Sequence, residues 1–213
     1  MVSLLRIRFV IFGLSGTCLN IFLMKAKDEA LKNMWGLPEG TLNEDESLEI
    51  AAQRAYCELA GFENIFLEQL YTFVFPSGSL EKQTVQILYY AMTNRNKCSI
   101  EPNLGTDGNK WFPVSNLPSL NLFDRKYCQL GLKKLQEKTQ RQPIGFYQLP
   151  VEFELSDLRR IYEMILGRNL NLNDFKSKMF EIDLLVPLSE KGTFRFNTKK
   201  YFELKHKGFY LDI

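Results

Sequence analysis

Residues 35–62, WGLPEGTLNEDESLEIAAQRAYCELAGF, decide the fold of this 213-residue chain. The stretch predicts the end of a strand, a loop and then a helix of about four turns. Pro38 and Gly40 mark the loop, since proline interrupts a strand and glycine frees the backbone. The helix is predicted to follow an acidic run that suits the positive end of its dipole, and to end at Gly61. Its apolar face consists of residues at helical spacing: Leu48, Ala51, Ala52, Ala55 and Leu59.

This stretch resembles the Nudix box, a pattern of Gly, five residues, Glu, seven residues, and then Arg-Glu-apolar-any-Glu-Glu-any-Gly-apolar. Ala55 and Leu59 stand where the pattern has two of its glutamates. In the family, those carboxylates hold a divalent metal ion against a diphosphate and assist the attacking water. The residues of this chain that match the pattern are Gly40, Glu46, Arg54, Tyr56, Glu58, Gly61 and Phe62.

The two substitutions predict a chain that keeps the Nudix fold without its catalysis. Hard cations such as Mg²⁺ bind clustered carboxylates, and of the three glutamates expected in the helix only Glu58 is left. We therefore expect no catalytic residue, no metal site, no cofactor and no enzyme activity. The candidate ligand-binding residues are Arg54, Glu58, Glu46 and Trp35. Two plainer interpretations stay open, in which Glu58 merely pairs with Arg54 one turn earlier and Trp35 is a core residue.

The composition indicates a folded protein with unevenly distributed charge. Hydrophobic residues make up 45% of the chain, with 17 Phe and 9 Tyr, which argues against global disorder. Residues 1–124 hold 10 Lys or Arg against 14 Asp or Glu, residues 125–142 hold 6 against 1, and residues 143–213 hold 11 against 10. Four widely spaced cysteines argue against zinc and fit a reducing cytoplasm. A single histidine, His206, excludes His-based triads.

The first part of the chain predicts a mixed sheet. Residues 7–14 and 19–25 are predicted strands around a Ser15-Gly16-Thr17 turn, although the basic start and apolar run also resemble a signal peptide. Further strands are predicted at residues 66–75, 84–93 and 110–114. A basic amphipathic helix is predicted over residues 124–139, with lysines on its outer face. The expected fold class is α/β (α+β), a Nudix-type α/β/α sandwich.

The last part of the chain predicts a small winged helix-turn-helix domain. Ser156 is predicted to cap a helix over residues 157–166, and Asn171 to cap a second one. Strands at residues 184–188 and 193–197 then form a hairpin, the plan of a winged helix. We therefore expect a Nudix-like effector-binding domain over residues 1–140, a linker over residues 141–150 and a winged-helix DNA-binding domain over residues 151–213.

The two halves together resemble the Nudix-related transcriptional regulators. The junction carries the most specific similarity, with Pro143-Ile144-Gly145-Phe146 followed by Leu149-Pro150 and Phe153-x-Leu155. The resemblance implies an effector-responsive regulator, with double-stranded DNA and a sugar or ADP-ribose-like nucleotide as partners. It also implies a homodimer. No membrane association is expected, because the apolar run near the N-terminus is too short and broken to span a membrane.

The second helix of the winged domain is the predicted DNA reader. Its apolar stripe, expected to face inward, is Leu172, Phe175, Met179 and Ile182. Asn173 and Ser177 then face outward, and the Asn173 amide suits an adenine edge. The predicted phosphate contacts are Lys176, Lys178, Lys191 and Arg195.

Two other functions remain open from sequence alone. A hydrolase of nucleoside diphosphate-linked substrates could assemble a weak site from Glu46, Glu58 and an acidic residue elsewhere, such as Glu39 or Glu101. A winged domain can also dock protein instead of DNA. Phe180 falls on the outer side of its helix, where it could be exposed, form a dimer contact or be covered by the wing.

Overall fold

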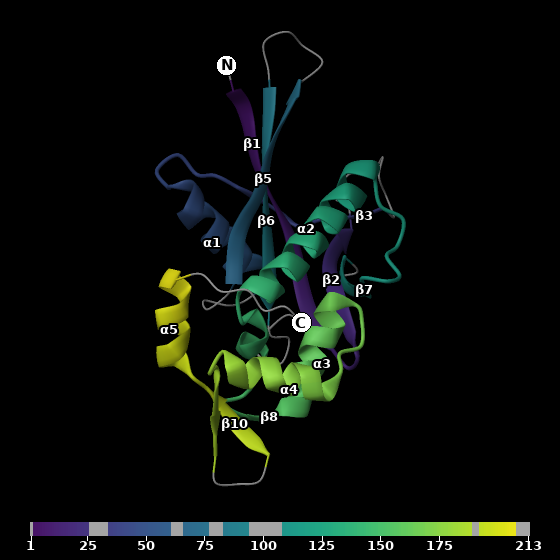
Figure 1. Cartoon of the computed structure of the whole chain (residues 1–213). Coiled ribbons are helices and arrows are strands. Elements are labelled where there is room, and N and C mark those ends of the chain that lie inside the picture. Colours follow the sequence, from purple (N-terminus) through teal and green to yellow (C-terminus); the bar gives the residue numbers. More distant parts are fainter. Residues whose placement is uncertain are drawn as a thin grey trace. The chain divides into compact units, whose positions relative to one another are not determined.

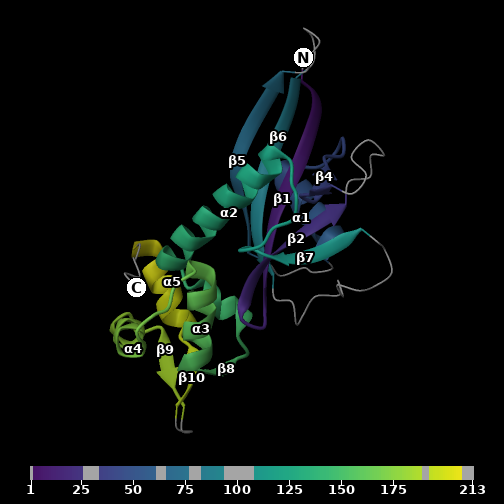
Figure 2. The same cartoon turned by 90° about the vertical axis from the view of Figure 1, so that its right-hand side faces the viewer.

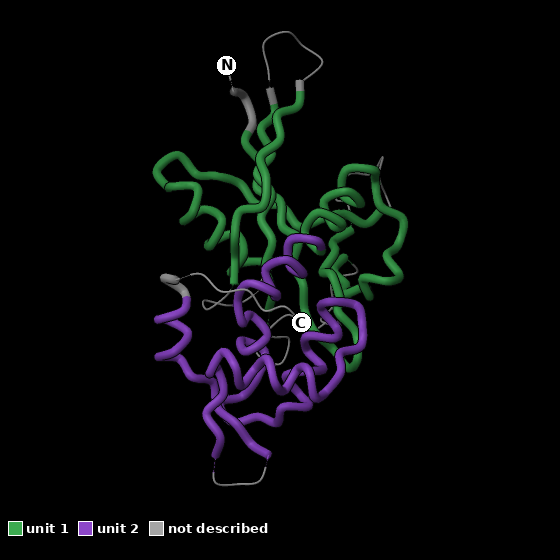
Figure 3. The backbone as a smooth tube through the Cα atoms, viewed as in Figure 1, with its two compact units in different colours: residues 1–132 green, residues 133–213 purple. Residues whose placement is uncertain are grey.

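The structure is a computed structural model that describes residues 2–25, 34–60, 66–76, 83–93, 108–188 and 192–207. The chain divides into two compact units, Met1–Leu132 and Lys133–Ile213 (Figure 3). The division falls within helix α2 (Leu122–Arg141). The domain limits and the linker drawn from the sequence stay predictions. Among the helices of the described residues, none has the length and apolar character needed to cross a membrane.

The first unit is built on a seven-stranded mixed sheet with the order β3-β2-β1-β6-β5, in which β4 pairs with β1 and β7 with β2. β1 and β6 are parallel, and the other pairs are antiparallel. The predicted hairpin is confirmed, with Phe12 opposite Ile21 and Gly16 in the left-handed region at φ 58°. The strands are β1 (Val2–Ser15), β2 (Cys18–Lys25), β3 (Trp35–Gly36), β4 (Glu39–Thr41), β5 (Phe66–Pro76), β6 (Gln83–Thr93) and β7 (Asn109–Pro113).

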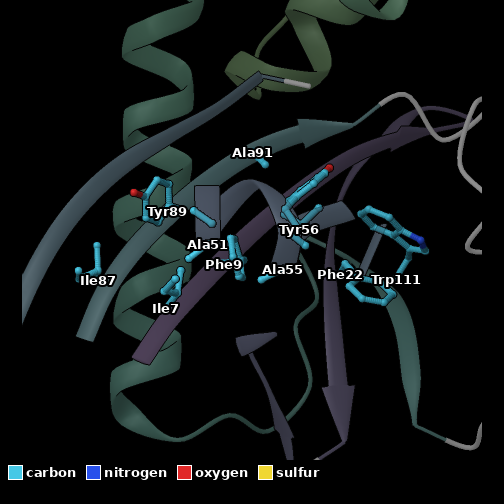
Figure 4. Close-up of a cluster of buried hydrophobic side chains, with 12 residues drawn as sticks. Ile7, Phe9, Phe22, Ala51, Ala55, Tyr56, Ile87, Tyr89, Ala91 and Trp111 are labelled. Atoms are coloured by element: carbon cyan, nitrogen blue, oxygen red, sulfur yellow. The ribbon is translucent and has the colours of Figure 1, made fainter. Parts of the chain in front are cut away.

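Helix α1 (Leu48–Ala60) carries the box sequence and covers one face of this sheet. Its small residues allow a close approach to the alternate residues of β1, among them Ile7 and Phe9 (Figure 4). The Phe9 ring lies 6.2 Å from the ring of Tyr56 in an edge-on arrangement. The predicted apolar face of the helix is confirmed, because Ala51, Ala52 and Ala55 are buried and Leu48 and Leu59 pack against the same cluster.

Helix α2 covers the opposite face of the sheet (Figure 2). A Cβ added at Gly131 would lie 2.8 Å from the Val10 side chain, so the helix backbone lies close against the sheet there. The Tyr127 ring stacks on Phe73 at 4.8 Å, and its hydroxyl donates to Gln86. Burial raises the pKa of Tyr127. The two helix layers around one sheet confirm the expected α/β/α sandwich.

The second unit has the elements of a winged helix (Figure 1). Its core surrounds Tyr162 and Phe175, whose rings lie 5.4 Å apart. The small sheet has the order β8-β10-β9, and its strands are antiparallel. The elements are η3 (Ile144–Gln148), β8 (Glu152–Glu154), α3 (Leu155–Leu166), α4 (Leu172–Glu181), β9 (Leu185–Pro187), β10 (Thr193–Phe196) and α5 (Thr198–Lys207).

Several expectations for this unit need correction. Ser156 does not cap α3, because β8 leads directly into the helix at Leu155 and the Ser156 hydroxyl donates to Glu154. Leu172 does not face inward, and 46% of it is exposed. Leu170, just before the helix, fills the core instead. The predicted linker contains the 3-10 helix η3, and neither β8 nor α5 was predicted.

Candidate functional site

Arg54 is the centre of the box. Its Nε and one terminal nitrogen donate to the two carboxylate oxygens of Glu46 at 3.0 and 2.5 Å. The same terminal nitrogen donates to the Thr41 carbonyl at 2.8 Å. The other terminal nitrogen lies 3.3 Å from Glu58. Arg54 therefore joins helix α1 to the end of β4 and to the loop that follows it.

The positive charge of Arg54 and the negative charges of Glu46 and Glu58 compensate one another. The hydrogen bonds from Arg54, and then the backbone N–H of Asn43 at 2.7 Å, lower the pKa of Glu46. The bond to Glu46 is also the largest cause that raises the pKa of Arg54. The pairing of Glu58 with Arg54 at i,i+4, one of the two interpretations of Glu58, is present. Three predicted ligand residues thus lie together, and their role toward a ligand stays a prediction.

The helix does not fit a divalent metal of the Nudix kind. Ala55 and Leu59 belong to the hydrophobic core, and Glu46 and Glu58 are both paired with Arg54. In the described part of the chain, no group of three or more His, Cys, Asp or Glu side chains could hold a metal ion. Glu39, one acidic residue considered as a replacement, pairs with Arg6 and Arg8, and Glu101 lies outside the described residues.

Trp35 contacts another part of the first unit. It is half-buried, with its ring edge-on to Phe112 at 4.8 Å and the Lys25 ammonium 5.8 Å from its centre. These contacts give Trp35 a packing role beside β2 and β7, and its predicted ligand role stays untested.

The sequence did not point to Asp124, which positions the start of the box loop. This buried carboxylate accepts a 2.6 Å bond from the Arg8 guanidinium and a 3.0 Å bond from the backbone N–H of Leu37. Asn121 accepts a bond from the Asp124 backbone N–H at 2.9 Å and so caps α2. The Asn-x-x-Asp spacing was an available signal for a helix start, but the long-range pair with Arg8 was not.

The turn between α3 and α4 is held by side chains of α3. Glu163 accepts the backbone N–H of Leu170 at 2.9 Å, and Arg159 donates to the Leu170 carbonyl at 3.4 Å. The predicted cap at Asn171 is confirmed, because its side-chain oxygen accepts the N–H groups of Asn173 and Asp174 at 2.8 and 3.2 Å. These bonds fix the direction in which α4 starts.

Helix α4 has a buried side and a solvent-facing side. Phe175 and Met179 are fully buried. The predicted DNA residues Asn173, Lys176 and Ser177 are exposed. Leu172 and Phe180 are exposed on this helix too, although the Phe180 ring also packs edge-on against Phe194 of the wing at 5.7 Å. The solvent-facing side therefore combines polar, basic and large apolar groups.

The other predicted DNA residues have different surroundings. Lys178 forms an ion pair with Glu181 on its own helix at 3.5 Å. Arg195 is exposed on β10 and lines a groove of the second unit. Lys191 lies outside the described residues. The DNA role of all three stays a prediction.

Comparison with known proteins assigns both parts of the chain. A family model of the NUDIX domain matches residues 4–130, and a model of the NrtR DNA-binding winged helix domain matches residues 145–200. A protein of Acinetobacter baylyi (strain ATCC 33305 / BD413 / ADP1), named ADPR responsive transcriptional repressor NtrR, is 28% identical over 182 residues. That alignment covers 84% of this chain and 72% of the relative.

Solved structures agree with this assignment. The crystal structure of Shewanella oneidensis NrtR complexed with a 27mer DNA has a TM-score of 0.76 at 23% identity, over 94% of this chain and 96% of that one. At this identity the likeness shows the fold. The NUDIX domain of the same Shewanella protein, complexed with ADP ribose, has a TM-score of 0.51 at 26% identity, over 63% and 90%. Since the NUDIX model spans more than half of the chain, this chain belongs to the Nudix family and carries a winged helix domain of the NrtR type.

Proposed function

We propose that this protein is an effector-responsive transcriptional regulator. Its Nudix unit binds a sugar nucleotide of the ADP-ribose class, and this binding controls the affinity of the winged-helix unit for DNA. The observation that carries the proposal is the presence, in one chain, of a Nudix box without two of its carboxylates and an NrtR-type winged helix. The name of the Acinetobacter baylyi relative, an ADPR responsive repressor, supports both parts.

In this proposal, the exposed side of α4 contacts the DNA bases. A recognition helix enters the major groove with its N-terminal residues at the base edges, and a homodimer places two such helices on a near-palindromic site. The Asn173 side chain near the start of α4 can form two bonds with an adenine edge. Lys176, one turn along the helix, suits a phosphate.

The DNA experiment starts from a site recovered by in vitro selection. Asn173→Ala should relax the preference at one base pair and cost roughly 1–3 kcal/mol on the selected site only. Lys176→Gln should weaken selected and generic DNA alike and reduce the salt slope by about one. Lys126→Gln, on the exposed surface of α2, is the matched control. Failure to select any site at low salt, with or without ligand, would favour a protein-docking role.

The effector is tested separately by thermal unfolding. ADP-ribose should raise the melting temperature of the intact chain, because any ligand that binds only the native state stabilises it by mass action. Pentoses, hexoses and other nucleotides at the same concentration define the ligand class. If none of these ligands stabilises the protein at millimolar concentration, effector binding is refuted. The proposal that the protein binds DNA would be unaffected.

We also propose that the Nudix unit does not hydrolyse its ligand. Ala55 and Leu59 provide no carboxylate, and the remaining Glu58 is paired with Arg54. Incubation with ADP-ribose and Mg²⁺ or Mn²⁺ should therefore give no enzymatic turnover. A rate on the order of 1 per second that Glu58→Gln abolishes would restore the hydrolase interpretation.

A further inference from the structure

The second unit contains a groove that lies apart from helix α4. It is formed by η3, β8, β9, β10 and the start of α5, and no residue of α4 lines it. Its volume is about 710 Å³. Small-molecule sites occupy roughly 300–1,000 Å³, so the groove has the size of a ligand site.

The floor of the groove is aromatic. Phe146 lies 4.2 Å from Phe196 and 5.5 Å from Phe153, measured between ring centres. Tyr201 continues the series at 5.7 Å from Phe196. All four line the groove, and Phe146, Phe153 and Tyr201 are buried. Such a floor offers rings against which a flat apolar ligand can pack.

The rim of the groove leaves further apolar surface in water. Tyr147, Val151 and Phe202 line it with exposed fractions of 59%, 81% and 54%. Exposed apolar residues gathered around one concavity often mark a binding site. Covering them would contribute favourable free energy to binding, because apolar surface would leave water.

Two positive charges give the groove its chemical preference. Arg195 from β10 and Lys199 from α5 both line it and are exposed. Within the described residues no acidic side chain lines the groove, and neither cation has an ion-pair partner. Glu152 lies opposite Arg195 in the β8–β10 pair, but it neither lines the groove nor forms an ion pair with Arg195. An anionic group on a ligand in the groove would therefore be attracted by the two cations.

We propose that this groove binds a small aromatic anion. The ring packs on the Phe146 floor, and a carboxylate, sulfonate or phosphate lies beside Arg195 and Lys199. A neutral apolar molecule or an uncharged peptide would use the rings and gain nothing from the two cations. The site is thus distinct from both the Nudix unit and α4, and it does not depend on whether the protein binds DNA.

Two dyes with a common aromatic skeleton test the proposal on the full chain. 8-Anilino-1-naphthalenesulfonate carries a negative charge, and N-phenyl-1-naphthylamine lacks it. The dissociation constant of each is measured by fluorescence at low and high salt. A charge of either sign can be introduced at Val151. Its high exposure allows Val151→Lys and Val151→Asp without disturbing the core. The matched control pair, Val74→Lys and Val74→Asp, lies on exposed β5 surface in the other unit.

The sulfonate dye should bind Val151→Lys more tightly and Val151→Asp more weakly, each by about two- to fivefold at low salt. Lys199→Gln should weaken it by a similar factor, and high salt should reduce all three differences. The neutral dye should bind all variants equally, and the Val74 pair should change neither dye. Equal effects on both dyes would refute the anion preference. An unchanged sulfonate affinity in the Val151 and Lys199 variants would refute the site.

Discussion

At Gly40, strand β4 passes so close to helix α1 that no side chain fits. A Cβ added there would overlap the Ala55 methyl group and lie 3.5 Å from the Phe9 ring. Neither the helix backbone nor a buried ring can easily move away. Gly40→Ala should therefore lower the free energy of unfolding by about 1–3 kcal/mol, measured in urea. Gly108→Ala is the matched control, since nothing lies within 4 Å of its added Cβ. Equal losses in both variants would contradict the packing argument.

Glu46 gives the stability of the first unit a predictable acid dependence. Its pKa is lowered from the ordinary value of 4.5, chiefly by the hydrogen bonds from Arg54. A lowered folded-state pKa means that the carboxylate stabilises the fold above the unfolded-state value and loses this contribution as the pH falls through the folded-state value. Melting temperatures should therefore drop below about pH 4.5 more steeply in the wild type than in Glu46→Gln. At neutral pH, Glu46→Gln should be the less stable protein. Parallel curves would show that Glu46 makes no such contribution.

At the scale of single elements, α4 depends on its cap. Asn171 accepts two N–H groups that would otherwise be unpaired at the helix start. Asn171→Ala should therefore destabilise the second unit by about 1 kcal/mol, whereas Asn171→Ser should retain most of the cap. Denaturation of the full chain, followed by probes in each unit, measures the difference. An Asn171→Ala variant as stable as Asn171→Ser would show that the cap is dispensable.

A second prediction for α4 concerns a base contact by Leu172, and it rests on the proposed function. It is the first residue of the helix and is 46% exposed, so it is placed to meet a base edge in the major groove. An apolar side chain there suits the methyl group of thymine. Replacing one thymine of the selected site by deoxyuridine should weaken wild-type binding, and Leu172→Ala should be insensitive to the replacement. Identical sensitivity in both proteins would remove Leu172 from the base contacts.

The elements that could be predicted from the sequence are those with a long periodic pattern or a side-chain signal at their ends. Helix α1 has its apolar stripe, α4 has the Asn171 cap, and β1 and β2 alternate around a turn. Strand β8 has three residues, too few to show a period. Helix α5 was missed although Asn197 caps it by accepting the N–H of Lys200 at 3.1 Å, a signal that was readable.

The candidate site residues also differ in how far they could be predicted from the sequence. Arg54, Glu46 and Glu58 follow from the box spacing, because their contacts are local to one helix and its loop. The aromatic groove could not be predicted, since it is assembled from η3, β8, β9, β10 and α5, and three of these five elements had not been expected. Side chains of separate elements meet there only after the unit folds.

At the scale of the whole molecule, the proposed function requires that ADP-ribose binding to one unit and DNA binding to the other are thermodynamically linked. If ADP-ribose changes the affinity for the selected DNA by some factor, DNA must change the affinity for ADP-ribose by the same factor. Allosteric factors of this kind are typically about 5–150, and the argument holds for either direction of control. Titration of ADP-ribose with and without saturating DNA, and of DNA with and without saturating ADP-ribose, should therefore give equal ratios.

Lys176→Gln provides the control for this experiment. It removes an exposed charge of α4, so it should weaken DNA while leaving the affinity of the DNA-free protein for ADP-ribose unchanged. The coupling ratio should also survive in this variant, because a uniformly weakened phosphate contact lowers DNA affinity in both ligand states alike. An ADP-ribose affinity that is the same with and without DNA, in a protein that binds both, would show two independent sites. Control of DNA binding by ADP-ribose would then be refuted, even though the protein would still bind both ADP-ribose and DNA.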